Sequence, residues 1–112
     1  MADKKRKMRR SALRFDIAVI GERVCLAGTA RYGVLSLAVN RVRRDPRKRP
    51  RSKTVEKWCR EECNLRIGAI ARGYQESWEK ATLEQGDEIT IRILGAGSSE
   101  VPDQRYRVIT LE

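Results

Sequence analysis

The residues with the clearest chemistry in this sequence are arginines and lysines concentrated in two short segments. Residues 41–60 carry a net charge of +8 and residues 1–10 carry +5, whereas the whole chain of 112 residues carries +10. The basicity therefore belongs to these segments and not to the rest of the chain. Cationic side chains near a polyanion release its condensed counterions, which gives salt-dependent affinity for phosphates without base specificity. We therefore predict a non-enzymatic protein that binds nucleic acid through a basic arm and a basic loop.

The predicted phosphate-binding residues follow from this distribution of charge. In the loop at 43–54 they are Arg43, Arg44, Arg47, Lys48, Arg49, Arg51 and Lys53, and in the N-terminal arm they are Lys4, Lys5, Arg6, Lys7, Arg9 and Arg10. Charge alone does not separate nucleic acid from an acidic protein surface. The alternative prediction is a protein-interaction module that binds an acidic partner or self-associates through the edge of a sheet.

Each of the three tyrosines lies within two residues of an arginine. The pairs are Arg31-Tyr32, Arg72-Gly73-Tyr74 and Arg105-Tyr106-Arg107. A tyrosine face beside a guanidinium suits an unpaired base, and stacking contributes about 1–3 kcal/mol per base. We therefore predict that Tyr32, Tyr74 and Tyr106 stack on bases. The alternative is that they are ordinary sheet residues at the ends of strands.

The cysteines favour packing over metal binding. A closed zinc site needs four ligands, commonly cysteine or histidine. The chain has no histidine, so Cys25, Cys59 and Cys63 would need a carboxylate such as Glu62 to complete a site. Free cysteine is among the most buried residue types, and we predict apolar packing, with neither a metal site nor a cofactor.

The inventory of reactive groups argues against catalysis. Without histidine, the chain lacks the commonest general base and the Ser-His and Cys-His nucleophile pairs. The adjacent carboxylates at 61–62 and 87–88 point to different faces of a helix or strand, and there is no glycine-rich phosphate loop. We predict that the protein is not an enzyme and has no catalytic residue.

The compartment is predicted from cysteine content and from hydropathy. An odd number of cysteines without a secretory signal favours a reducing compartment, which is the cytoplasm. The basic runs at 4–7 and 46–50 resemble nuclear localisation signals, which would indicate the nucleus in a eukaryote. No stretch approaches the roughly 20 apolar residues of a membrane span, so no membrane partner is expected.

The elements that position these residues are predicted to be mainly strands. Alternating apolar residues and turn signals at roughly ten-residue spacing predict a small antiparallel barrel or sandwich of about six strands. The expected strands are 13–20, 23–27, 34–42, 65–72, 89–94 and 106–111, with a loop at 95–103. We expect a disordered basic arm at 1–10, because like charges repel and there is little to bury, and a single domain at 11–112.

One short helix is predicted at residues 55–63. Thr54 is a suitable N-cap, and Val55, Trp58, Cys59 and Cys63 lie on one stripe at helical spacing. We expect this stripe to pack on the sheet. Replacing a tryptophan buried in that way by alanine would cost about 3–5 kcal/mol of stability.

Overall fold

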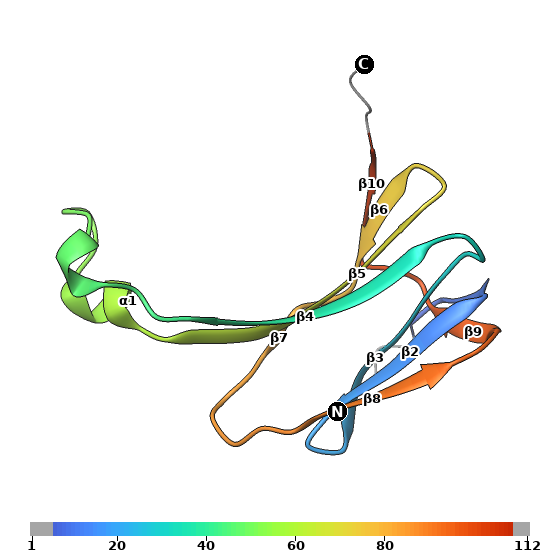
Figure 1. The fold of residues 1–112 in the computed structure, drawn as a ribbon, viewed down its shortest axis with the longest axis horizontal. Coiled ribbons are helices and arrows are strands. Elements are labelled where there is room, and N and C mark those ends of the chain that lie inside the picture. The colour runs from blue at the N-terminus through green and yellow to red at the C-terminus, as the bar shows by residue number, and fades with distance from the viewer. Residues whose placement is uncertain (1–5, 109–112) are drawn as a thin grey trace.

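The computed structural model describes residues 6–108, which form a mainly β, sandwich-like fold that does not close into a barrel (Figure 1). The elements are β1 (Met8–Ser11), β2 (Leu13–Val19), β3 (Glu22–Thr29), β4 (Val34–Val42), the 3-10 turn η1 (Pro46–Lys48), α1 (Val55–Cys59), β5 (Glu62–Ala71), β6 (Tyr74–Ser77), β7 (Ala81–Thr82), β8 (Ile89–Leu94), β9 (Gly97–Glu100) and β10 (Gln104–Arg107). One sheet has the order β3-β2-β8, and the other has the order β10-β6-β5-β4 with β7 also paired to β5. A small third sheet joins β1 to β9. The predicted fold class is confirmed, with more strands than expected.

The core lies between the two larger sheets. Ile17, Cys25 and Ala27 come from the β3-β2-β8 sheet, and they meet Leu65 and other residues of β5 on the facing sheet. Leu35 and its neighbours on β4 pack only partly against this core, as expected for an outer strand of an open sandwich. Because β5 supplies buried residues at alternate positions, its register is firmly fixed by the core.

Two-residue turns close two of the hairpins. Ile20 and Gly21, between β2 and β3, have φ values of 50° and 77°, and Arg72 and Gly73, between β5 and β6, have φ values of 53° and 76°. Positive φ at both central residues gives the twist that a tight hairpin requires. The second turn places the Arg72 side chain at one end of the sandwich.

The N-terminal segment differs from the prediction. Residues 8–10, expected in the disordered arm, belong to β1, which pairs with β9 from Met8 opposite Glu100 to Ser11 opposite Gly97. The physical reason is electrostatic pairing, because the cations of this segment meet carboxylates of the folded domain. Residues 1–5 lie outside the described part of the chain.

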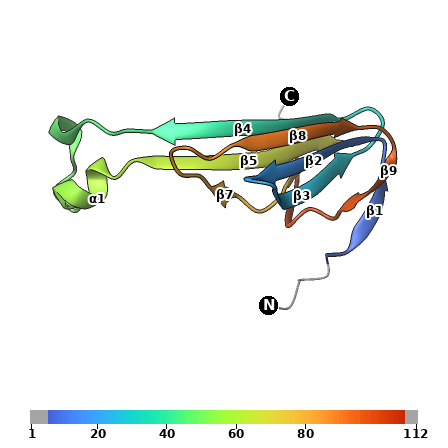
Figure 2. The same cartoon turned by 90° about the horizontal axis from the view of Figure 1, so that it is seen from below.

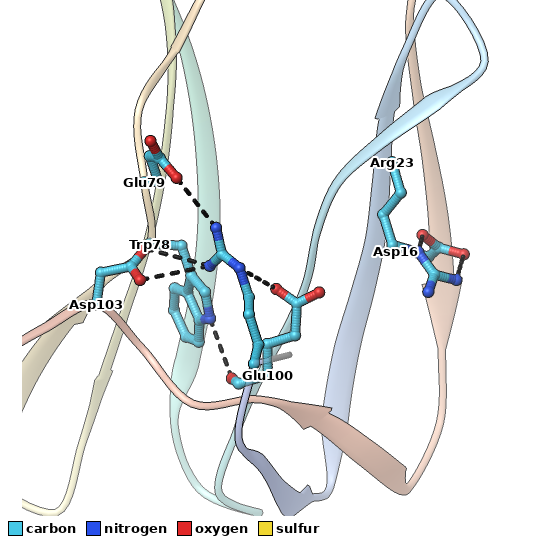
Figure 3. A network of polar contacts seen from close by, with 7 residues as sticks. Asp16, Arg23, Trp78, Glu79, Glu100 and Asp103 are labelled. Carbon is cyan, nitrogen blue, oxygen red and sulfur yellow. Dashed lines mark hydrogen bonds and ion pairs between the residues drawn. The ribbon is translucent and has the colours of Figure 1, made fainter. Parts of the chain in front are cut away.

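Arg6 shows this pairing most clearly. Its guanidinium lies 3.1 Å from Glu79, 3.4 Å from Glu100 and 3.3 Å from Asp103. Figure 3 shows these carboxylates gathered beside Trp78, whose indole nitrogen donates to the Glu100 carbonyl at 3.1 Å. The same figure shows a separate ion pair between Arg23 and Asp16 on the β2–β3 hairpin.

The helix α1 is shorter than predicted and does not lie against the sheet. It ends at Cys59, none of its residues is buried, and Cys63 belongs to β5. The prediction that the helix packs on the sheet is therefore wrong. The β4–β5 ladder continues to the pair of Val42 with Glu62, so the residues after Arg60 extend that ladder instead of a helix.

The C-terminal part also differs in detail. The predicted loop at 95–103 contains β9, whose partner β1 was not expected to be a strand. The last strand, β10, begins earlier than predicted and pairs with β6. Residues 109–112 lie outside the described part, and with them positions 109–111 of the expected strand. Within residues 6–108, no helix has the length and apolar character to cross a membrane.

Candidate nucleic-acid interface

The basic loop lies at the end of a long β-hairpin that projects from the sandwich (Figure 2). The nine residues of β4 would span about 30 Å at about 3.3 Å per residue. Residues 43–61 connect β4 to β5, and we call them the arm tip. Because the strands that carry it are paired throughout, the arm tip is held away from the body of the protein.

Side-chain capping explains why the arm tip folds locally. The Asp45 carboxylate accepts the backbone N–H of Arg47 at 2.9 Å, which starts the 3-10 turn at Pro46. The Thr54 hydroxyl accepts the N–H of Lys57 at 3.2 Å and caps α1, as predicted from the sequence. These caps order a segment that has no buried residue in either helical turn.

Trp58 joins the two helical turns of the arm tip. Its indole nitrogen donates to the Asp45 carbonyl at 2.8 Å. The Arg44 guanidinium carbon lies 5.5 Å from the ring centroid and the Lys53 ammonium nitrogen lies 5.9 Å from it. Cations this close to an indole ring are attracted by its quadrupole. The half-buried tryptophan is thus the centre of a small local cluster and not part of the main core.

Four arginines at the base of the arm tip are paired with carboxylates. Glu61 accepts hydrogen bonds from Arg41 and from Arg43, and these bonds lower the pKa of its carboxyl below the usual value. Arg44 lies 3.2 Å from Glu62 and its hydrogen bond lowers the pKa of that carboxyl too. Arg47 pairs with Asp45, also at 3.2 Å, and its backbone and side-chain hydrogen bonds lower the Asp45 pKa. These arginines hold the arm tip together in addition to carrying charge.

The remaining cations of the arm tip have no carboxylate partner within residues 6–108 at ion-pair distance. They are Lys48, Arg49, Arg51, Lys53, Lys57 and Arg60, all exposed. Arg49 donates instead to the Lys53 carbonyl at 2.6 Å. Lys57 and Arg60 were not among the predicted site residues, because residues 55–63 were expected to form a helix that packs on the sheet. Both residues lie within the run of positive charge at residues 41–60, and this run could have identified them.

The cations predicted to bind phosphate from the N-terminal segment, residues 1–10, are not part of the arm tip. Arg9 is held by Glu76 through two hydrogen bonds of 2.7 Å and by the Gly28 carbonyl at 2.8 Å, and Arg6 is occupied by three carboxylates. Lys7 and Arg10 are exposed. Lys4 and Lys5 lie outside the described residues. Ion pairing therefore makes Arg6 and Arg9 structural residues in this fold.

The tyrosines lie at the opposite end of the sandwich from the arm tip. Tyr32 precedes β4, Tyr74 begins β6, and Tyr106 is paired with Gln75 across β10 and β6. Tyr32 is 87% exposed and Tyr106 is 58% exposed, whereas Tyr74 is half-buried under Arg105. The structure therefore brings the tyrosines to one end but does not place them beside the basic loop.

The three cysteines are free and lie in different surroundings. Cys25 is buried in the core, and burial raises the pKa of its thiol to about 12. Cys59 and Cys63 are half-buried, and the single helical stripe predicted for them is interrupted where β5 begins. Among the described residues, no three cysteine, aspartate or glutamate side chains gather in a way that would hold a metal ion.

No family model matches the chain, and neither the curated proteins nor the solved structures include one that is detectably similar to it.

Proposed function

We propose that the protein binds nucleic acid through phosphate contacts made by the arm tip, without catalysing a reaction. The observation that carries the proposal is the group of six exposed cations without carboxylate partners among residues 6–108, on a hairpin that projects from the body. A projecting, ordered cationic segment reaches a polyanion without a clash from the sandwich. Phosphate contacts of this kind supply affinity that falls as salt is added.

The ion-paired and the unpaired cations of the arm tip would have different roles in binding. Arg43, Arg44 and Arg47 are engaged with carboxylates, so they keep the arm tip in shape while remaining near the ligand. The unpaired cations have their hydrogen-bond donors available for phosphate oxygens. Replacing an unpaired cation should therefore weaken binding without unfolding the domain.

The test is the affinity of labelled single-stranded and duplex oligonucleotides, measured by fluorescence anisotropy at fixed salt. The tip variant carries Arg51→Gln, Lys57→Gln and Arg60→Gln. Its matched control removes the same number of exposed positive charges from the sheets and the segment after β6. The control substitutions are Arg66→Gln, Lys80→Gln and Arg92→Gln. Weaker binding by the tip variant alone supports the proposal, whereas equal affinities for the two variants would refute it.

A second candidate is self-association through an edge of a sheet, and the exposure of β8 favours it. This strand ends the β3-β2-β8 sheet, and its Ile91 and Ile93 side chains are 42% and 81% exposed. An apolar edge strand offers unpaired backbone groups to a second chain. Sedimentation velocity of the wild type and of Ile93→Lys tests this candidate. A monomer at every concentration of the wild type would remove it.

A further inference from the structure

A cavity of about 410 Å³ lies at the end of the sandwich opposite the arm tip. It is bounded by β1, the ends of β3 and β5, and the strands β6 and β10. Five arginines and one carboxylate line it: Arg9, Arg10, Arg31, Arg72, Arg105 and Glu76. Three of these arginines, Arg31, Arg72 and Arg105, belong to the Arg-Tyr pairs singled out in the sequence, so the fold brings the arginines of three separate pairs to one opening.

Two of the arginines share the carboxylate as an ion-pair partner. Arg9 binds Glu76 at 2.7 Å, and the Arg105 side chain lies 3.7 Å from the same group. Arg10, Arg31 and Arg72 are exposed, and in the described part of the chain no carboxylate lies within 4.0 Å of their guanidinium groups. The cavity therefore has an excess of positive charge that an anion would balance.

A buried hydroxyl in the wall of the cavity also lacks a partner. Thr29 is 1% exposed, and its Oγ1 atom makes no hydrogen bond within residues 6–108. A buried hydroxyl without a partner is energetically costly, whereas the nearby hydroxyls of Ser11 and Ser99 satisfy each other at 2.6 Å. Because less than 1 Å² of this atom is accessible, a ligand in the cavity does not reach it, so the contacts to an anion come from the arginines.

Exposed aromatic surface lies beside the charged wall. The Arg31 guanidinium carbon is 5.3 Å from the centroid of the Tyr32 ring, which is 87% exposed. A nucleotide is recognised by two kinds of group: arginine side chains donate hydrogen bonds to its phosphate, and an aromatic ring stacks on its base. Both kinds of group lie side by side here.

We propose that this cavity is a nucleotide site, in which Arg10, Arg31 and Arg72 bind a phosphate and Tyr32 stacks on the base. The ligand is a nucleoside phosphate, either free or at the end of a strand, because the two share the same recognition chemistry. The site is separate from the arm tip and does not depend on the function proposed for it.

Isothermal titration calorimetry with adenosine 5′-monophosphate, inorganic phosphate and adenosine tests the site. The monophosphate should bind and adenosine should not. Arg31→Gln and Arg72→Asn should each weaken binding by about tenfold or more, since each removes charge-assisted hydrogen bonds. Asparagine is chosen at position 72 because it tolerates the positive φ of that turn.

Tyr32→Ala separates the two halves of the site. It should weaken binding of the monophosphate by about fivefold to 150-fold, the range of base stacking, and leave binding of inorganic phosphate unchanged. Arg66→Gln, on an exposed position outside the cavity, is the matched control and should bind as the wild type does. Failure of the monophosphate to bind at millimolar concentration would overturn the proposal. Equal affinity of the arginine variants and the wild type, with unchanged melting temperatures, would also overturn it.

Oligonucleotides of two kinds distinguish a free nucleotide from a strand end. They are tested in the background of the tip variant, in which binding by the arm tip is weakened. Single-stranded oligonucleotides with a 5′-phosphate or a 5′-hydroxyl are compared. Preference for the phosphorylated strand, lost on Arg31→Gln, would assign the site to strand ends. Equal binding of both strands with retained binding of the monophosphate would assign it to free nucleotides. Both results support the site, and neither depends on the outcome for the arm tip.

Discussion

Replacing Arg9 should cost much more stability than replacing an ordinary surface arginine. Both of its terminal nitrogens lie 2.7 Å from Glu76, and one of them also donates to the Gly28 carbonyl at 2.8 Å. The Glu76 side chain is 6% exposed and that of Arg9 is 29% exposed. Removing one partner of a fully buried pair costs about 3–5 kcal/mol, because the other charge is left without compensation.

For Arg9→Met we expect a loss of about 2–3 kcal/mol, somewhat below that range. Arg9 is partly exposed, and Arg105 remains 3.7 Å from the Glu76 carboxylate. For a domain of this size the loss corresponds to a decrease in Tm of about 10–20 °C. The free energy of unfolding is measured by urea denaturation, with Lys7→Met as a control that removes an exposed positive charge from the same segment.

A double-mutant cycle with Glu76→Gln isolates the pairwise contribution. The double variant should lose less than the sum of the two single variants, since Arg9→Met then no longer leaves a buried charge. A loss below about 0.5 kcal/mol for Arg9→Met, the value of an exposed pair, would show that β1 is not held by this contact.

Gly28→Ala should destabilise the domain by about 1–3 kcal/mol, because a Cβ there would approach the buried Ser99 and Ser11 side chains, the nearest contact being 2.6 Å; Gly95→Ala, with open space around it, should change the Tm little. Burial raises the pKa of Cys25 from 9.0 to about 12, so native protein should alkylate there far more slowly than at the other two cysteines. The Cys25 thiol ionises at lower pH in the unfolded chain than in the folded protein, so its contribution to the free energy of unfolding should fall as pH rises from 9.0 towards about 12. Alkaline denaturation of the wild type and of Cys25→Ser measures this contribution. Trp58→Ala should disorder the arm tip and weaken oligonucleotide binding with a loss of about 1 kcal/mol or less in global unfolding, since its neighbours are local; a loss of 3–5 kcal/mol would contradict that assignment.

Strand periodicity predicted much of the fold. The alternation of residues 34–42 predicted β4 with its observed bounds, and the strand expected at 65–72 overlaps β5, where Leu65, Ile67 and Ala69 are buried at alternate positions. Local patterns were sufficient there because one face of each strand meets the core. In β4 the alternating apolar residues do not all face the core. Val39 is 51% exposed, because the hairpin leaves the sandwich there.

Long-range pairing could not be predicted from local patterns. β1 exists because Glu76 pairs with its Arg9 side chain and β9 pairs with its backbone, and both partners are distant in sequence. The stripe at 55–63 fits a helix equally well in isolation, but the cross-strand pair of Arg41 with Cys63 continues the hairpin and ends the helix early. The basic loop was recognisable from charge, whereas the gathering of Arg31, Arg72 and Arg105 around one cavity required the topology.

The salt dependence of oligonucleotide binding tests the role of the arm tip most directly. For duplex DNA, the slope of log K against log salt changes by about 0.9 for each phosphate contact. The tip variant, with three unpaired cations replaced, should therefore have a slope about 2–3 units less steep than the wild type. The matched control with Arg66→Gln, Lys80→Gln and Arg92→Gln should keep the wild-type slope. A tip variant with an unchanged slope, or a matched control with the same reduction, would contradict the proposal that the arm tip contacts the phosphates.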